Sequence, residues 1–443
     1  MKRKWKWGLF LGTPLMVYGV VVAQATLHVR AMLREQVGIE SRISGIVFPL
    51  GIGMAVIGSD VAWSHESNRF SADMLWLSGM NAGSGIMETV WVKNFILVMG
   101  TDTVTASEVH VQGLEVAAFE TAVTGQSFLS QKPFSLLRGK DLRFSSKGDV
   151  ATFSRLDISL GEHGQVVDAR AEDGQILKIS GAFANFSDVQ FSGLAWPVLA
   201  GLAGLDVMSS PYPLKKLDVQ GVVAQGSKGE KLSCGHCSLL NHGDDGMADL
   251  IGENLVFMPV PDGSFRELLP DGMTGNLSLR LAYDRNTRVL VFDPLRVETL
   301  NGILDVEMKL GNVPDVQAGN PGLLFAGGVT LIKFSGTFED SGLLLGILQR
   351  RAEKLEISMA MQAETLIKDI AGLSGGRDSE IRSRRILQDQ MIPFLTHPDG
   401  VSVVFQPVKP IPLLGLCVAL SLQPELVLPL LERGDLVLDR KRH

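Results

Sequence analysis

The sequence predicts a mainly β protein in which antiparallel strands form a long body between an N-terminal membrane anchor and a helical C-terminal module. Three observations support this. Residues 1–27 join a basic cluster to an apolar run, residues 28–338 alternate apolar and polar side chains between turn residues, and residues 339–443 carry apolar side chains at helical spacing. With 45% hydrophobic and 20% charged residues, the chain is able to bury a core.

Charge and length predict the anchor. Lys2, Arg3, Lys4 and Lys6 precede an uncharged apolar run over residues 7–27. A helix rises about 1.5 Å per residue, so this run can cross a hydrocarbon core of about 30 Å with its basic end in the cytoplasm. We therefore expect a single-pass protein whose bulk is exported. A cleavable signal peptide is the alternative, because residues 23–25 have the small-x-small pattern of a cleavage site.

The composition limits the partners and the chemistry. The formal net charge is −7 although the first six residues contribute four basic side chains, so the exported body is acidic. An acidic body has no basic stripe for phosphates, and we expect no nucleic-acid partner. The sequence contains no nucleophile elbow, phosphate-binding loop or H-E-x-x-H motif, so we expect neither enzymatic activity nor a cofactor.

The body contains short alternating runs that end at Gly, Asp, Asn or Pro, which is the pattern of antiparallel strands joined by tight turns. Each run has one apolar face and one more polar face. Residues 197–208 are the main helical exception. The clearest runs are Leu156-Ile158-Leu160, Leu217-Val219-Gly221-Val223, Leu277-Leu279-Leu281 and Val306-Met308-Leu310.

The period changes after Phe338, where apolar residues step by three or four and predict one amphipathic helix. We expect Asp340 or Ser341 to cap it, Gly375-Gly376 to end it, and its apolar stripe to pack on the sheet rather than in a coiled coil. A second helix is expected from residue 378 or 379 to about 395, followed by a strand over residues 401–405. The stripe consists of Leu344, Leu348, Ala352, Leu355, Met359, Ala363, Leu366, Ile370 and Leu373.

This order of elements resembles the AsmA-like envelope proteins of Gram-negative bacteria. The segments that carry the resemblance are FDPLRV at 292–297, NGILDVEMKL at 301–310 and FSGTFEDSGL at 334–343. Residues 393–403 and 407–410 are similar to segments of uncharacterised alphaproteobacterial membrane-anchored periplasmic proteins. The resemblance implies an inner-membrane anchor, a periplasmic sheet curled into an apolar groove, and a part in moving or balancing lipids between two membranes. It implies no catalytic residues, and this chain is short for a protein that bridges the periplasm alone.

The alternation leaves two architectures open. An apolar sheet face must be hidden in a sandwich core or against a bound acyl chain, because exposing it costs about 25 cal/mol per Å². We expect the groove, and with it an inner-membrane-anchored periplasmic protein that binds phospholipid or another lipid and maintains the envelope. The alternative is a scaffold that docks envelope proteins. The residues expected to contact lipid are Leu277, Leu279, Leu281, Val306, Met308 and Leu310.

Cys234-Gly-His-Cys237 has the form of a disulfide-isomerase redox motif. No helix or βαβ pattern surrounds it, so we expect a structural disulfide or a thiol pair in a turn, and thiol-disulfide chemistry is the third candidate function. Zinc bound with the help of His236 and His242 is a further alternative, disfavoured by the cramped spacing.

Three other groups are given structural interpretations. Cys417 is expected to be a buried, inert thiol. The acidic residues at 244, 245 and 249 are expected to form a solvated turn rather than a cation site. The aromatic residues Trp63, Phe70, Trp76 and Trp91 are expected in the core, with a ligand-contacting cluster as the alternative.

Overall fold

The computed structural model describes residues 40–42, 45–47, 55–65, 68–81, 85–115, 132–194, 214–242, 246–260, 272–314, 328–372, 389, 394–395, 400–416 and 434–440. The predicted anchor at 1–27, the predicted helix at 197–208, Cys417 and most of the second C-terminal helix lie outside these residues. The chain divides into two compact units, residues 1–205 and 206–443, which are described separately.

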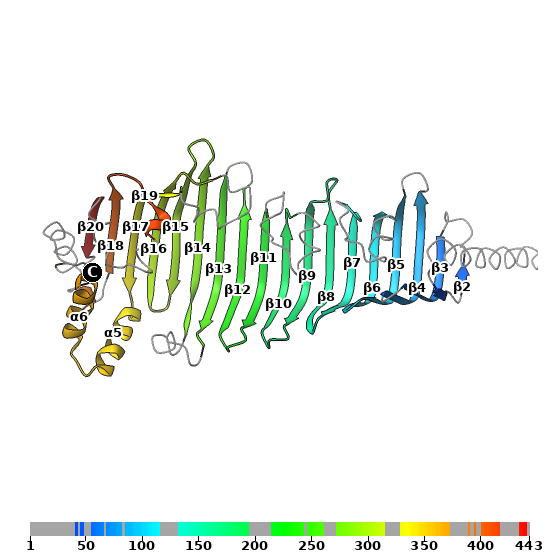
Figure 1. Ribbon diagram of the computed structural model, residues 1–443, viewed down its shortest axis with the longest axis horizontal. Coiled ribbons are helices and arrows are strands. Elements are labelled where there is room, and N and C mark those ends of the chain that lie inside the picture. The colour runs from blue at the N-terminus through cyan, green and yellow to red at the C-terminus, as the bar shows by residue number, and fades with distance from the viewer. Residues whose placement is uncertain are drawn as a thin grey trace, which may run out of the picture. The chain divides into compact units, whose positions relative to one another are not determined.

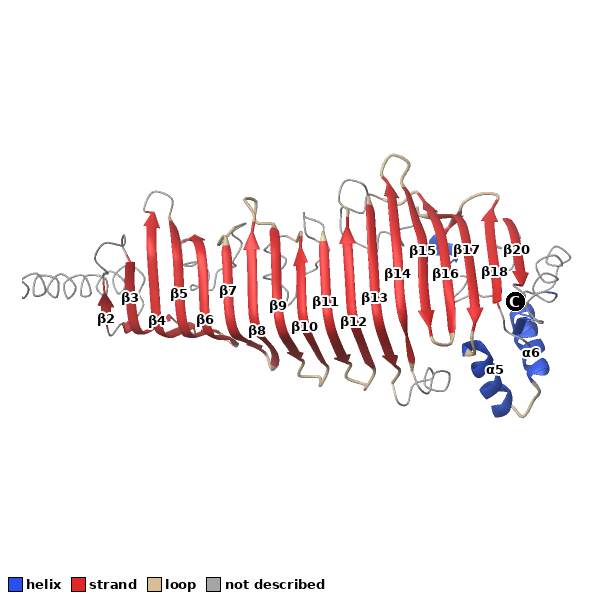
Figure 2. Cartoon of the chain, turned by 180° about the vertical axis from the view of Figure 1, so that it is seen from behind, coloured by secondary structure: helices blue, strands red, loops and turns tan. Residues whose placement is uncertain are grey.

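The first unit is an antiparallel sheet in which each strand from β3 to β10 pairs with its neighbours along the chain. Two short strands, β1 and β2, also pair with β3. In Figures 1 and 2 strands β4 to β9 lie side by side in chain order. The strands are β1 Glu40–Arg42, β2 Gly45–Val47, β3 Ala55–His65, β4 Asn68–Asn81, β5 Ile86–Met99, β6 Asp102–Glu115, β7 Leu136–Ser146, β8 Asp149–Leu160, β9 Val166–Leu177 and β10 Phe183–Ser192.

The second unit repeats this plan from β11 to β18, again with antiparallel neighbours, and β20 pairs with β18 while β19 pairs with β17. The strands are β11 Lys216–Gln225, β12 Lys231–Asn241, β13 Met247–Met258, β14 Met273–Asp284, β15 Val289–Thr299, β16 Gly302–Gly311, β17 Thr330–Asp340, β18 Gly400–Pro407, β19 Ile411–Pro412 and β20 Gly434–Arg440.

The prediction of a mainly β, antiparallel fold is confirmed. The alternating runs at 156–160, 217–223, 277–281 and 306–310 lie on β8, β11, β14 and β16, and the strand expected over 401–405 lies on β18. Helices are few and short in the described part of the chain, and none there is long and apolar enough to span a membrane.

The apolar stripe predicted one long C-terminal helix, and this prediction is wrong about the number of helices. The structure has two helices, α5 Leu343–Lys354 and α6 Met359–Gly372, with a break in which Glu356 has φ 55°. Leu355, placed on the predicted stripe, is 51% exposed. Ser358 precedes the second helix and caps it, since its Oγ accepts a hydrogen bond of 3.2 Å from Met361 N. The N-cap residue of α5 is Gly342, which has no side chain to bond there, and the carboxylate of Asp340, two residues earlier, accepts the hydrogen bonds from Leu344 N and Leu345 N in its place.

Both units contain a row of small polar residues or glycines that crosses the strands near mid-length, which we call the crease. Alternate strands contribute a residue with positive φ, a conformation that Asn, Asp and Gly tolerate and that other residues avoid. These residues are Asn94 (φ 47°) on β5, Asp141 (φ 49°) on β7, Asp173 (φ 47°) on β9, Gly221 (φ 63°) on β11 and Asn254 (φ 53°) on β13.

On two of the intervening strands a serine hydroxyl donates hydrogen bonds to the crease aspartate of the next strand and to the carbonyl oxygen of the residue before it. Ser107 Oγ on β6 donates to Lys140 O at 3.2 Å and to Asp141 Oδ2 at 2.6 Å. Ser154 Oγ on β8 donates to Glu172 O at 3.1 Å and to Asp173 Oδ2 at 3.0 Å. The crease is therefore a repeated structural unit of two strands.

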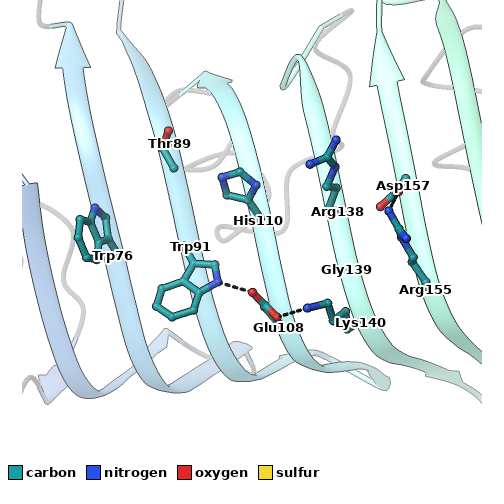
Figure 3. A pocket seen from close by; sticks show the side chains of 10 residues that line it. All are labelled: Trp76, Thr89, Trp91, Glu108, His110, Arg138, Gly139, Lys140, Arg155 and Asp157. Atoms are coloured by element: carbon teal, nitrogen blue, oxygen red, sulfur yellow. Dashed lines mark hydrogen bonds and ion pairs between the residues drawn. The ribbon is translucent and has the colours of Figure 1, made fainter.

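At the crease of the first unit neighbouring strands change phase together, because β4, β5 and β6 pair through it without a register shift. On β5, Val90 and Val92 belong to the same hydrophobic cluster as Phe95 and Leu97, although the step from Val92 to Phe95 is three residues rather than two. The two intervening residues, Lys93 and Asn94, are exposed. The row is therefore a bend that paired strands share rather than a β-bulge in one of them, and Figure 3 shows the strands turning just below Glu108 and Lys140.

Candidate functional site

The six residues predicted to contact lipid lie on one face of the second unit. Leu277, Leu279 and Leu281 come from β14, and Val306, Met308 and Leu310 come from β16. Strand β15 lies between them and completes the face, since Leu279 pairs with Leu295 and Leu295 pairs with Val306. Phe292 joins Leu281 to Met308 in the same way.

The row through Leu279 continues across the sheet. In order of pairing it contains Leu217, Leu239, Leu250, Leu279, Leu295 and Val306, one from each strand from β11 to β16. We call this row the apolar strip. All six side chains are half-buried. Six consecutive strands thus present a continuous line of apolar side chains, each of which is half-buried.

The six predicted residues differ in their burial. Leu310 is 1% exposed and belongs to a buried cluster with Leu331 and Phe405, so it is a core residue. Leu281 and Met308 are half-buried and pack against that cluster. Leu277, Leu279 and Val306 are half-buried and belong to none of the buried clusters of the described chain. These three are the best candidates for contact with a ligand.

The two helices cover one end of this face. Leu348 of α5 and Ala363 of α6 form a buried cluster with Val401, and Phe338 and Val403 pack against it. Phe338 pairs with Leu304 on β16, so the helices follow directly on the apolar face. Among the described residues of this unit the strands form one sheet, and no second sheet lies over the strip. The described residues therefore give no sandwich here.

The two cysteines are joined by a disulfide within a single strand. Cys234 and Cys237 lie in the middle of β12, not in a turn as one of the sequence interpretations had it. Cys234 is 4% exposed. Redox-active pairs of this type commonly lie at a helix N-terminus, which lowers the thiol pKa, whereas this pair lies within a strand. His236 faces Asp218 and Glu253, each at 3.5 Å, and the described residues contain no cluster that could hold a metal.

The first unit has a pocket on the polar face of its sheet, with a volume of about 600 Å³. Sequence analysis missed it. It lies on the face opposite the hydrophobic cluster, and its residues belong to the successive strands β4 to β8. Figure 3 shows these side chains on one face of neighbouring strands. The residues that line it are Trp76, Thr89, Trp91, Glu108, His110, Arg138, Gly139, Lys140, Arg155 and Asp157.

Register explains how these residues meet. Trp76 pairs with Trp91, Trp91 with His110, His110 with Arg138 and Arg138 with Asp157. The five side chains thus form one row across β4 to β8. Trp76 and Trp91 are half-buried in this pocket rather than in the core, whereas Phe70 is a core residue at 4% exposed. The side chain of Trp63 lies outside the described part of the chain.

Two ion pairs hold part of the pocket wall. Glu108 accepts hydrogen bonds from Lys140 Nζ at 2.7 Å and from Trp91 Nε1 at 2.8 Å. These bonds, that of Lys140 first, lower the pKa of Glu108 below its usual value of 4.5. Arg155 Nη2 donates to Asp157 Oδ2 at 2.6 Å, which raises the pKa of Arg155.

The sequence carried a signal for the crease but a weak one for the pocket. The crease residues stand in tetrapeptides of one type, VKNF at 92–95, GKDL at 139–142, AEDG at 171–174, VQGV at 219–222 and GENL at 252–255. The pocket residues are polar positions of alternating strands, where a solvated face is the ordinary expectation. Only the pairing of the strands brings them together.

The chain matches no model of a known protein family, and no curated protein matches its sequence.

Proposed function

We propose that this is an inner-membrane-anchored periplasmic protein that binds lipid, or another apolar chain, along the apolar strip of its second unit. In this proposal it contributes to lipid homeostasis of the cell envelope. The single observation that carries the proposal is the half-buried strip from Leu217 to Val306, with no second sheet over it among the described residues.

The physical reason is the cost of leaving such a strip in water. Leaving apolar surface in water costs a free energy of about 25 cal/mol per Å² relative to burying it. Large exposed apolar patches on proteins therefore mark binding surfaces. Acyl chains fit a line of Leu and Val side chains because they need dispersion contacts and no hydrogen-bond partners. The bend at the crease supports a groove, since a bent sheet surrounds a chain better than a flat one.

The test uses the full chain extracted in detergent. Phospholipid that co-purifies is measured by mass spectrometry in the wild type and in Leu279→Asp, which places a charge on the strip. Ser278→Asp, the neighbouring residue on the opposite face, is the matched control. We expect bound lipid in the wild type and in Ser278→Asp, and a loss of most of it in Leu279→Asp.

Thermal unfolding separates lipid binding from a structural role. Leu279→Asp should unfold within a few degrees of the wild type, whereas Met308→Asp should unfold much earlier because Met308 packs on a buried cluster. Wild-type protein free of lipid, or a Leu279→Asp variant that fails to fold, would overturn the proposal. Either result would favour the scaffold alternative.

A further inference from the structure

We propose that the polar-face pocket of the first unit binds an anionic sugar, a ring with free hydroxyl groups that carries a phosphate or a carboxylate. The inference is independent of lipid binding, because the pocket and the apolar strip belong to different units. It rests on three features of the pocket: an uncommitted cation, an uncommitted acceptor and two adjacent indole rings.

The uncommitted cation is Arg138. Three cationic side chains and two carboxylates line the pocket, and Lys140 pairs with Glu108 while Arg155 pairs with Asp157. Arg138 is exposed and has no hydrogen bond or ion pair with any described residue. Lys93 lies close by, with its Nζ 4.9 Å from the centre of the Trp91 ring, and adds positive charge. In a protein with a net charge of −7, this locally positive hollow favours an anion.

The uncommitted acceptor is Asp157. Its Oδ2 accepts the bond from Arg155, but its Oδ1 is buried and has no hydrogen-bond partner among the described residues. A buried carboxylate oxygen without a partner is costly; the Asp157 side chain is 22% exposed and lines the pocket, so a ligand donor that displaces the atoms covering Oδ1 would satisfy it. Sugar hydroxyl groups are such donors. Asp157 pairs with Arg138 across β7 and β8, so one ligand can reach both residues.

The two indoles supply an apolar platform beside these charges. Trp76 and Trp91 are cross-strand partners, and Figure 3 shows them on the same face as Arg138 and Asp157. Trp91 is oriented by its bond to Glu108, so the ring is held in place before a ligand arrives. Indole rings pack well against the C–H face of a pyranose, because both surfaces are flat and apolar. An inorganic anion alone would leave this platform unused.

The experiment measures binding to the detergent-solubilised full chain by titration calorimetry. The probes are glucose 1-phosphate, glucuronate, neutral glucose and inorganic phosphate. We expect glucose 1-phosphate and glucuronate to bind at least roughly tenfold more tightly than either glucose or phosphate. Arg138→Gln should weaken the two anionic sugars by roughly tenfold or more and leave glucose unchanged, since the lost contact is to the charge. Trp76→Ala should weaken the anionic sugars and glucose alike.

Arg143→Gln is the matched control, because Arg143 is an exposed arginine on the same strand that does not line the pocket. A second arm compares phosphatidylinositol with phosphatidylcholine in the same micelles, which separates a lipid-linked ring from a free one. A response in either arm that Arg138→Gln abolishes and Arg143→Gln preserves supports the site. Equal binding by the two arginine variants, or no binding of any anionic probe at millimolar concentration, overturns it.

Discussion

Trp91 Nε1 donates a hydrogen bond of 2.8 Å to Glu108 Oε1, and this bond ties an indole of β5 to a carboxylate of β6. Glu108 Oε2 accepts from Lys140 of β7 at 2.7 Å. One carboxylate therefore links three successive strands and fixes one wall of the polar-face pocket. The Glu108 side chain is 33% exposed, so solvent can protonate the carboxylate and salt can screen its attraction to Lys140.

The first prediction concerns the pH dependence of this link. The pKa of Glu108 is lowered in the folded protein, chiefly by Lys140 and then by Trp91. Its contribution to stability is therefore fully present above the unfolded pKa of 4.5 and is lost as the pH falls through the lower folded pKa. The indole N–H signal of Trp91, followed by NMR, should shift with a midpoint below 4.5. Glu108→Gln should remove the transition, and a midpoint at or above 4.5 in the wild type would contradict the assignment.

The second prediction concerns the backbone at the crease. Asp141→Val places a β-branched residue at φ 49° and removes the acceptor of Ser107, whereas Asp141→Gly removes only the acceptor. Valine should be less stable than glycine by about 1–2 kcal/mol, the cost of the left-handed conformation. Denaturant unfolding measures the difference. Arg143→Val, two residues along the same strand and outside the crease, should change stability little, and equal stability of the two Asp141 variants would argue against strain.

A third prediction concerns the disulfide of β12. Replacing both Cys234 and Cys237 by Ser should reduce the free energy of unfolding only modestly, at the low end of about 0–5 kcal/mol, because the bridge closes a very short loop. Any envelope phenotype should be nearly unchanged. Loss of function in a variant that unfolds like the wild type would instead point to thiol or metal chemistry at these residues.

The fourth prediction concerns the start of α5. Asp340→Ala removes the acceptor of Leu344 N and Leu345 N and should lower stability by about 1 kcal/mol, as the loss of a helix cap usually does. Hydrogen exchange of these two amides should accelerate. Ser341→Ala is the control, since Ser341 is exposed and only its backbone N–H bonds to Asn301 O. Equal effects of the two substitutions would show that Asp340 is not the cap.

The strands were predictable because alternation is a direct consequence of strand geometry. Leu277, Leu279 and Leu281 share one face for that reason, and the structure places β14 there. The break between α5 and α6 was not predictable from the stripe, because Ala352 and Met359 keep helical spacing across it. The Ser358 cap was the missed local signal.

The two candidate sites also differ in how far the sequence pattern predicts them. The apolar strip could be expected from the alternation of each strand by itself. The polar-face pocket could not, since Trp76 and Arg138 are far apart in sequence and meet only through the register of β4 to β7. The burial of Leu310 was also beyond the pattern, because Leu331 and Phe405 on later strands enclose it.

The two-strand period of the crease has a consequence for how the length of the first sheet can change. Removing β7 and β8 together would bring β6 beside β9 with antiparallel direction kept, and Ser107 would face Asp173 as Ser154 does in the intact protein. Removing β7 alone would place two parallel strands next to each other with too short a connection, and would set Ser107 against Ser154 with no left-handed residue between them. The sheet of the first unit can therefore be lengthened or shortened by whole hairpins but not by single strands. Repeat proteins, in which each repeat contacts only the adjacent repeats, behave in this way.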